Sequence, residues 1–100
     1  MKCFISQIMA GLTDQEILER RAEIEAYVRF SISDDVEFIS SFIEEDAPKN
    51  VNPGIWYLGK SIELLAQADL FVVSKDALGS RGCDFEYNIA RSYDIKILIV

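Results

Sequence analysis

One glutamate near the C-terminal end of the chain stands where an enzyme could use it. The segment 81–86 (RGCDFE) lies between an apolar run, predicted as a strand over residues 69–74, and a predicted helix over residues 85–93. Open α/β sheets bind ligands at the carboxyl ends of their strands, where such loops lead into helices. A carboxylate in the first turn of this helix would point into that crevice. Glu86 is therefore the candidate catalytic residue.

Two roles are open to Glu86. A carboxylate at the margin of an apolar helix face can have a raised pKa, and it could act as an acid, as a base or as a nucleophile on an anomeric carbon. Cys83 and Ala90 share its helical row. In the alternative, a first-turn glutamate only stabilises the helix through the macrodipole. The spacing by itself favours the structural role.

Two loops would border the same crevice. Residues 79–82 (GSRG) precede the helix, and they could bind a phosphate through backbone N–H groups, the Ser80 hydroxyl and Arg81. In the alternative, this loop uses glycine only for positive φ angles. The second loop follows the first strand, and its candidate substrate-binding residues are Ser6, Gln7, Met9 and Gly11.

Arg21 lies between Ile17 and Ile24 on the apolar side of the first predicted helix. A buried guanidinium requires an anion. That anion is either a ligand or a structural carboxylate. We expect a structural carboxylate, from Asp69 or Glu63.

The order of predicted elements indicates an α/β fold. Strands are predicted over residues 2–7, 36–42, 69–74 and 96–100, separated by helices. Thr13 and Glu16 match a capping box that opens a helix to about Val28, with Ile17, Ile24 and Val28 on one face. Pro53 suits the first turn of the next helix, which carries apolar residues at 55, 58, 62 and 65. Strands that alternate with helices favour a four-stranded, mainly parallel sheet.

The composition narrows the classes of function. The chain has 100 residues, half of them hydrophobic, and is predicted to form a single domain over 1–100. Its net charge of −7 argues against non-specific nucleic-acid binding, and the absence of histidine excludes a histidine triad or an imidazole-ligated zinc. Cys3 and Cys83 form no disulfide or metal-binding pattern. No signal peptide or membrane span is recognised, so we expect a cytoplasmic protein that does not bind membranes. We also expect no metal and no cofactor.

The predicted last strand, residues 96–100, reaches the end of the sequence. A parallel strand is normally covered on both faces, and no residue follows Val100 to cover this one. Either the two preceding helices already cover it or a second subunit does, and we expect the second, a homo-oligomer.

Four blocks of sequence together resemble one known family: residues 4–14, 56–61, 68–70, and 81–83 with Glu86 and Ala90. This is the nucleoside 2-deoxyribosyltransferase-like family, a domain of unknown function found largely in phages and prophages. The resemblance covers nearly the whole chain. It implies a flavodoxin-like or Rossmann-like three-layer sandwich, and a glutamate nucleophile that attacks the anomeric carbon of a 2-deoxyribosyl group. Residues 86–90 match the pattern Glu-x-Gly-x-Ala of the related enzymes, with Asn88 in place of glycine.

The resemblance also implies roles for further residues. The loop from Ser6 to Gly11 would border the sugar, Ser80 would hold a 5′-phosphate beside Gly82, and Ser61 stands where the enzymes carry an aspartate that helps to protonate the leaving base. Ile8 replaces the usual proline of the first loop. The implied function is a nucleoside or nucleoside 5′-monophosphate N-glycosidase or 2-deoxyribosyltransferase. A non-catalytic nucleotide-binding module, such as a phage protein that captures a host nucleotide signal, and a structural subunit with a vestigial pocket are the alternatives.

Overall fold

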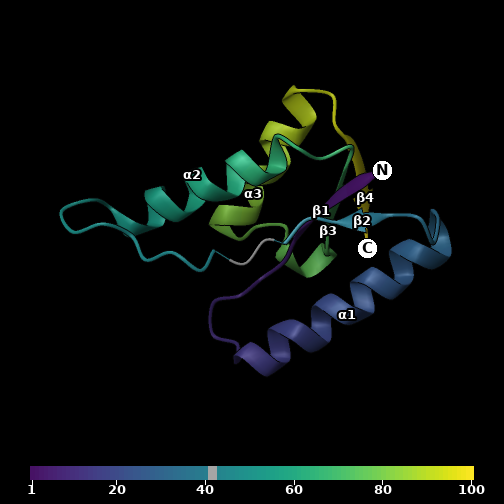
Figure 1. Cartoon of the computed structure of the whole chain (residues 1–100), viewed down its shortest axis with the longest axis horizontal. Coiled ribbons are helices and arrows are strands. Elements are labelled where there is room, and N and C mark those ends of the chain that lie inside the picture. Colours follow the sequence, from purple (N-terminus) through teal and green to yellow (C-terminus); the bar gives the residue numbers. More distant parts are fainter. Residues whose placement is uncertain (41–42) are drawn as a thin grey trace.

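Four parallel strands form one sheet with helices on both faces, as the computed structural model shows (Figure 1). The structure describes residues 1–40 and 43–100. The elements follow in the order β1 (Lys2–Ser6), α1 (Asp14–Ser31), β2 (Glu37–Phe38), α2 (Pro53–Leu65), β3 (Leu70–Val73), a short 3₁₀ helix (Lys75–Ala77), α3 (Arg81–Ser92) and β4 (Lys96–Ile99). The α/β fold expected from the sequence is confirmed, and it is a Rossmann-like or flavodoxin-like sandwich.

The strand order is β2-β1-β3-β4, and β1 and β3 pair from Cys3 opposite Leu70 to Ser6 opposite Val73. The chain leaves β1 toward one edge of the sheet and later returns to β3 on the other side of β1. This reversal is the topological switch point, where ligands of such sheets bind outside the carboxyl ends of the strands. Ser6 ends β1 at this point.

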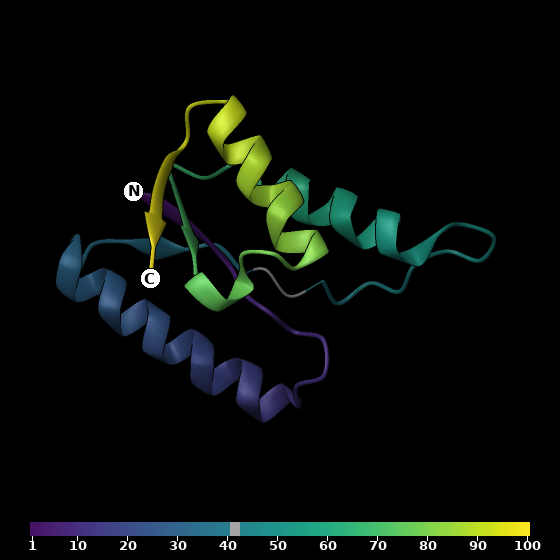
Figure 2. The same ribbon diagram turned by 180° about the vertical axis from the view of Figure 1, so that it is seen from behind.

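The sheet separates two apolar layers. Helix α1 covers one face, and α2 and α3 cover the other (Figures 1 and 2). Successive side chains of β1 point to opposite faces of the sheet. Cys3 and Ile5 pack with Ile24 and Val28 of α1, whereas Phe4 packs in the layer formed with α2 and α3. In that layer the ring of Phe4 stacks on Phe71, with 6.0 Å between ring centroids.

The beginning of α1 is built as the sequence predicts. The Thr13 side chain accepts a hydrogen bond from the N–H of Glu16, and the Glu16 side chain accepts one from the N–H of Thr13. Both donors belong to the helix start, which has no intrahelical partners for them. Ile17, Ile24 and Val28 are buried.

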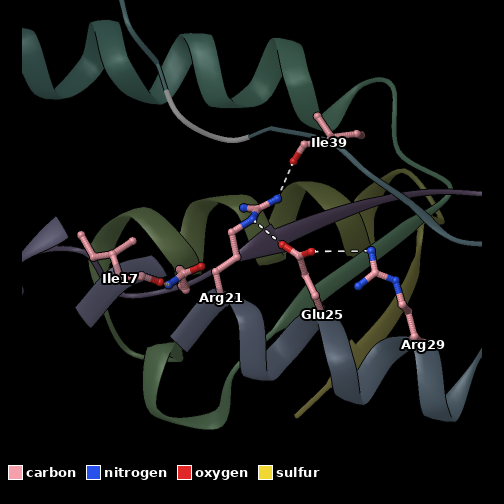
Figure 3. A network of polar contacts seen from close by, with 6 residues as sticks. Ile17, Arg21, Glu25, Arg29 and Ile39 are labelled. Carbon is pink, nitrogen blue, oxygen red and sulfur yellow. Dashed lines mark hydrogen bonds and ion pairs between the residues drawn. The ribbon is translucent and has the colours of Figure 1, made fainter. Parts of the chain in front are cut away.

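Arg21 is buried, but its carboxylate partner is not the one expected. Its Nε donates to Glu25, one turn along α1, at 2.9 Å, and its Nη2 donates to the carbonyl of Ile39 at 2.8 Å (Figure 3). The prediction of Asp69 or Glu63 is wrong. The Asp69 carboxylate accepts the backbone N–H of Lys2, and Glu63 pairs with Lys60 on the surface. A structural carboxylate is nevertheless what neutralises the guanidinium.

The second predicted strand is shorter than expected, and helix α2 is less buried than its apolar spacing suggests. The strand predicted over residues 36–42 is only Glu37–Phe38, and the carbonyl of the next residue, Ile39, accepts a hydrogen bond from Arg21. Residues 41–42 of that prediction lie outside the described residues. Helix α2 begins with Pro53 after the N-cap Asn52, as expected, yet it buries only Leu65 fully.

Within residues 1–40 and 43–100, no helix has both the length and the apolar composition that crossing a bilayer requires.

Candidate functional site

Helix α3 begins earlier than the sequence suggests. It starts at Arg81 rather than at residue 85, after the N-cap Ser80. Gly79 turns the chain with a φ of +102°, and its N–H donates to the Asp84 carboxylate at 2.8 Å, which fixes the approach to the helix. Glu86 therefore lies in the second turn of α3, whereas the sequence predicted the first turn. Because the macrodipole effect falls off beyond the first turn, it gives no sufficient reason for a glutamate here.

A cavity of about 540 Å³ opens beside the carboxyl end of β1, between the N-terminal parts of α2 and α3. This volume lies within the usual range for small-molecule sites, about 300 to 1,000 Å³. All the candidate residues except Gly11 line it, namely Ser6, Gln7, Met9, Ser61, Ser80, Gly82 and Glu86. Gly11 does not line it; this glycine, with a φ of +80°, lies in the turn closed by the bond from Leu12 N–H to Met9.

Glu86 is only 8% exposed, and its Oε1 accepts a hydrogen bond of 2.7 Å from the hydroxyl of Ser6. Burial raises the pKa of Glu86, because it disfavours the charged carboxylate, and the bond from Ser6 acts in the opposite direction. Cys83 and Ala90, on the same helical row, are also buried. The site thus holds a desolvated carboxylate that one hydroxyl orients.

The loop before α3 uses part of its hydrogen-bonding capacity internally. The Ser80 hydroxyl donates to the carbonyl of Ala77 at 2.8 Å, and the Gly79 N–H is taken by Asp84. The first bond of the helix runs from Asp84 N–H to the Ser80 carbonyl, so the N–H groups of residues 81–83 precede it. Together with Arg81, a residue of the cavity lining, these groups are donors that remain for an anion.

The side-chain amide of Gln7, the residue after β1, contacts α1 on the other face of the sheet from Glu86. Its Nε2 donates to the carbonyl of Ile17 on α1 at 3.2 Å, as alternation after Ser6 requires. Its Oε1 is buried, and no hydrogen-bond partner for it exists among the described residues. The amide thus ties the end of β1 to α1 beneath the cavity.

Apart from Ser61, the sequence did not single out the residues of α2 that line the cavity. Gly54, Tyr57 and Leu58 line the cavity together with Ser61, and Ile43 also lines it. The Tyr57 hydroxyl accepts a hydrogen bond of 3.3 Å from the N–H of Ala47. The apolar spacing of α2 is typical of a core helix and does not indicate a cavity wall. The only signal in the sequence is Tyr57, a residue with a polar hydroxyl close to the start of the helix.

The described lining of the cavity carries one carboxylate, Glu86, and one permanent cation, Arg81. In the described ranges, no three acidic, cysteine or histidine side chains gather where they could hold a metal ion. The described lining offers a carboxylate, a guanidinium, hydroxyl groups and backbone donors.

No protein-family model matches this chain, and neither the curated proteins nor the solved structures include a significant match.

Proposed function

We propose that the cavity binds a nucleoside or a nucleoside 5′-monophosphate and that Glu86 is the nucleophile that cleaves its N-glycosidic bond. The carboxylate in the cavity carries this proposal. It is 8% exposed, it lies at the topological switch point, and Ser6 holds it at 2.7 Å. A desolvated carboxylate of this kind is costly to fold, so its presence in a ligand-sized cavity favours a chemical role. The sequence resemblance to nucleoside 2-deoxyribosyltransferase-like proteins supports the choice of substrate.

In the proposed reaction, an oxygen of Glu86 attacks the anomeric carbon of the sugar. The bond from that carbon to the base nitrogen breaks, and the base leaves with the electron pair and takes up a proton. A glycosyl ester of Glu86 remains. Water hydrolyses this ester in an N-glycosidase, whereas a second base attacks it in a deoxyribosyltransferase.

The 5′ end of the substrate would lie at the start of α3. The N–H groups of residues 81–83 and the Arg81 guanidinium supply donors there. Charge-assisted bonds of this kind are about twice as strong as neutral ones. We therefore propose that a 5′-phosphate strengthens binding, with Ser80 beside it on the cavity wall.

A binding module without catalysis is the second candidate. Its support is the absence of a second carboxylate from the described lining, because glycosidases generally pair a nucleophile with an acid that protonates the leaving group. The hydroxyls of Ser61 and Tyr57, both on the α2 wall, are weak acids. A protein that captures a nucleotide signal would need the cavity and not the reaction.

Release of free base separates these candidates. The protein is incubated with the four deoxynucleosides and their 5′-monophosphates, and the products are resolved by chromatography. We expect base release by the wild type and a loss of orders of magnitude in Glu86→Gln, which keeps the shape but cannot form the ester. Glu23→Gln, an exposed change on α1, is the matched control. Binding without release by the wild type would establish the module instead, and absence of both would refute the proposal.

We further propose that the chain forms a homo-oligomer and acts in a reducing compartment such as the cytoplasm. Both cysteines are buried free thiols, which suits such a compartment. Apolar side chains at residues 51, 55 and 85 are each more than two-fifths exposed, which suits association.

A further inference from the structure

The hydroxyl of Ser6 is already occupied. Ser6 is 2% exposed, and its Oγ donates to Glu86 Oε1 at 2.7 Å. A serine hydroxyl carries a single donor proton. Because Ser6 gives this proton to Glu86, it has none to offer to a sugar or a base.

The backbone of Ser6 belongs to a strand that is paired on both sides. Ser6 ends the central strand β1 and pairs with Val73 of β3, whose side chain is fully buried. The residue two places before it, Phe4, packs into the same α2–α3 layer. The hydroxyl therefore holds Glu86 from a rigid element, as precise positioning of a reacting group requires.

The two oxygens of Glu86 have different surroundings. Within the described part of the chain, Ser6 is the only hydrogen-bond donor to this carboxylate, and it contacts Oε1. Among the described residues, Gln7 Oε1 is the only buried side-chain nitrogen or oxygen atom that has no hydrogen-bond partner. Oε2 of Glu86 is therefore not enclosed, and it keeps its contact with the cavity that Glu86 lines.

We propose that Ser6 is a positioning residue, which holds Glu86 by Oε1 and leaves Oε2 as the oxygen that attacks the substrate. This inference rests on the proposed function. It changes the role that the sequence suggested for Ser6, which was contact with the substrate. Ser6 acts through Glu86 and does not touch the reacting atoms.

The same bond influences the charge of Glu86. Burial raises the pKa of this carboxyl, and the hydroxyl of Ser6 lowers it. The other titratable or charged groups that line the cavity are Tyr57 of α2 and Cys83 and Arg81 of α3. The described residues of β1 and of its following loop add none. Removal of the hydroxyl therefore leaves burial as the dominant influence, and Glu86 should hold its proton to a higher pH.

A carboxyl titration tests this without any need for activity. The Glu86 side-chain ¹³C resonance, assigned by comparison with Glu86→Gln, is followed against pH in the full-length chain. We expect a higher midpoint in Ser6→Ala and a midpoint near the wild-type value in Ser6→Thr, which restores the hydroxyl. Ser74→Ala removes another buried serine, next to β3 and outside this cavity, and should leave the midpoint unchanged. Ser6→Cys keeps the volume with a weak donor and replaces Ser6→Ala if that variant fails to fold.

Kinetics give the second readout. We expect Ser6→Ala to lower kcat about 10- to 100-fold with little change in KM, the loss typical of a displaced reacting group. The acidic limb of its pH profile should move to higher pH. An unchanged midpoint with a raised KM would make Ser6 a substrate contact and overturn the inference. If the wild type releases no base, the proposed function fails, and the titration alone still decides the role of Ser6.

Discussion

Arg21 donates a hydrogen bond of 2.8 Å to the carbonyl oxygen of Ile39, which ties the middle of α1 to the segment that leaves β2 (Figure 3). Its Nε contacts Glu25 at 2.9 Å, and Glu25 in turn contacts Arg29 at 3.8 Å. The network satisfies a carbonyl at the point where β2 ends. It also anchors the chain shortly before Ile43, which lines the cavity.

Arg21→Ala should destabilise the protein strongly. The change leaves the Glu25 carboxylate, only 23% exposed, with the more distant Arg29, and it removes the donor of the Ile39 carbonyl. We expect a loss of about 2 to 3 kcal/mol in the free energy of unfolding, somewhat below the usual cost of breaking a fully buried pair. Urea unfolding measures it. Arg20→Ala, one residue away in exposed pairs with Glu23 and Asp76, should cost under about 1 kcal/mol. Equal losses would contradict a structural role for Arg21.

The parallel sheet could be predicted because its signals are local. The apolar run before Ser74 has the length of a buried strand, and the capping box at Thr13 marks a helix start by side-chain type alone. The same reasoning placed Glu86 on the helix after the predicted third strand, although it lies in the second turn of that helix and not in the first. These features depend on a few neighbouring residues, which is why a single sequence reveals them.

The contacts that complete the site could not be predicted in this way. Ser6 and Glu86 are separated by 80 positions, and they meet only because β1 and β3 pair in one register and α3 packs across them. The start of α3 depends on a bond from Gly79 to Asp84, not on apolar periodicity. Arg21 found its carboxylate one helical turn away, whereas charge alone allowed several candidates. Tertiary geometry decided each case.

Thr13→Ala should weaken the start of α1. The change removes the acceptor for the Glu16 N–H, one of the donors without an intrahelical partner. We expect a loss of about 1 kcal/mol in the free energy of unfolding, as is usual for an N-cap threonine. Thr13→Ser keeps the hydroxyl and should stay within a few tenths of a kcal/mol of the wild type. Chemical denaturation of the three proteins measures this, and equal stability of all three would show that the cap contributes nothing.

The buried carboxyl of Glu86 should make stability depend on pH. Folding raises its pKa above the ordinary value of 4.5, so the folded state binds this proton more tightly than the unfolded state does. The contribution is fully present below that ordinary value and is lost as the pH rises through the folded pKa. Glu86→Gln does not titrate. Its free energy of unfolding, minus that of the wild type, should therefore increase from pH 4 toward neutrality in a series of denaturation experiments. Glu23→Gln supplies the control, and a Glu86→Gln difference as flat as that of the control would rule out the shift.

The two thiols should react at different rates. Cys3 is completely buried, and burial raises its pKa to about 11, so it remains a protonated thiol at neutral pH. Cys83 lines the cavity at the start of α3. Alkylation of the folded protein, followed by mass spectrometry, should label Cys83 first, and a nucleotide in the cavity should slow that labelling. Faster labelling of Cys3 would contradict the predicted order of reactivity, and no protection by any nucleoside or nucleotide that binds would place the ligand elsewhere.

Association should depend on α2, the α-helix with the fewest fully buried residues. Ile55 near its start is 69% exposed, and Phe85 of α3 is 51% exposed. The two charged residues of α2, Lys60 and Glu63, pair with each other at 3.8 Å, so this helix adds no net charge to a chain of net charge −7. Like-charged copies meet most readily at such a neutral surface, because repulsion is least there.

Light scattering at micromolar concentration should give a mass above the 11.3 kDa of one chain, and Ile55→Lys should lower it toward that value. Leu18→Lys, which charges an apolar residue 51% exposed on α1, is the matched control and should leave the mass unchanged. A wild-type mass of 11.3 kDa would refute association, and an effect of Leu18→Lys alone would move the contact to α1.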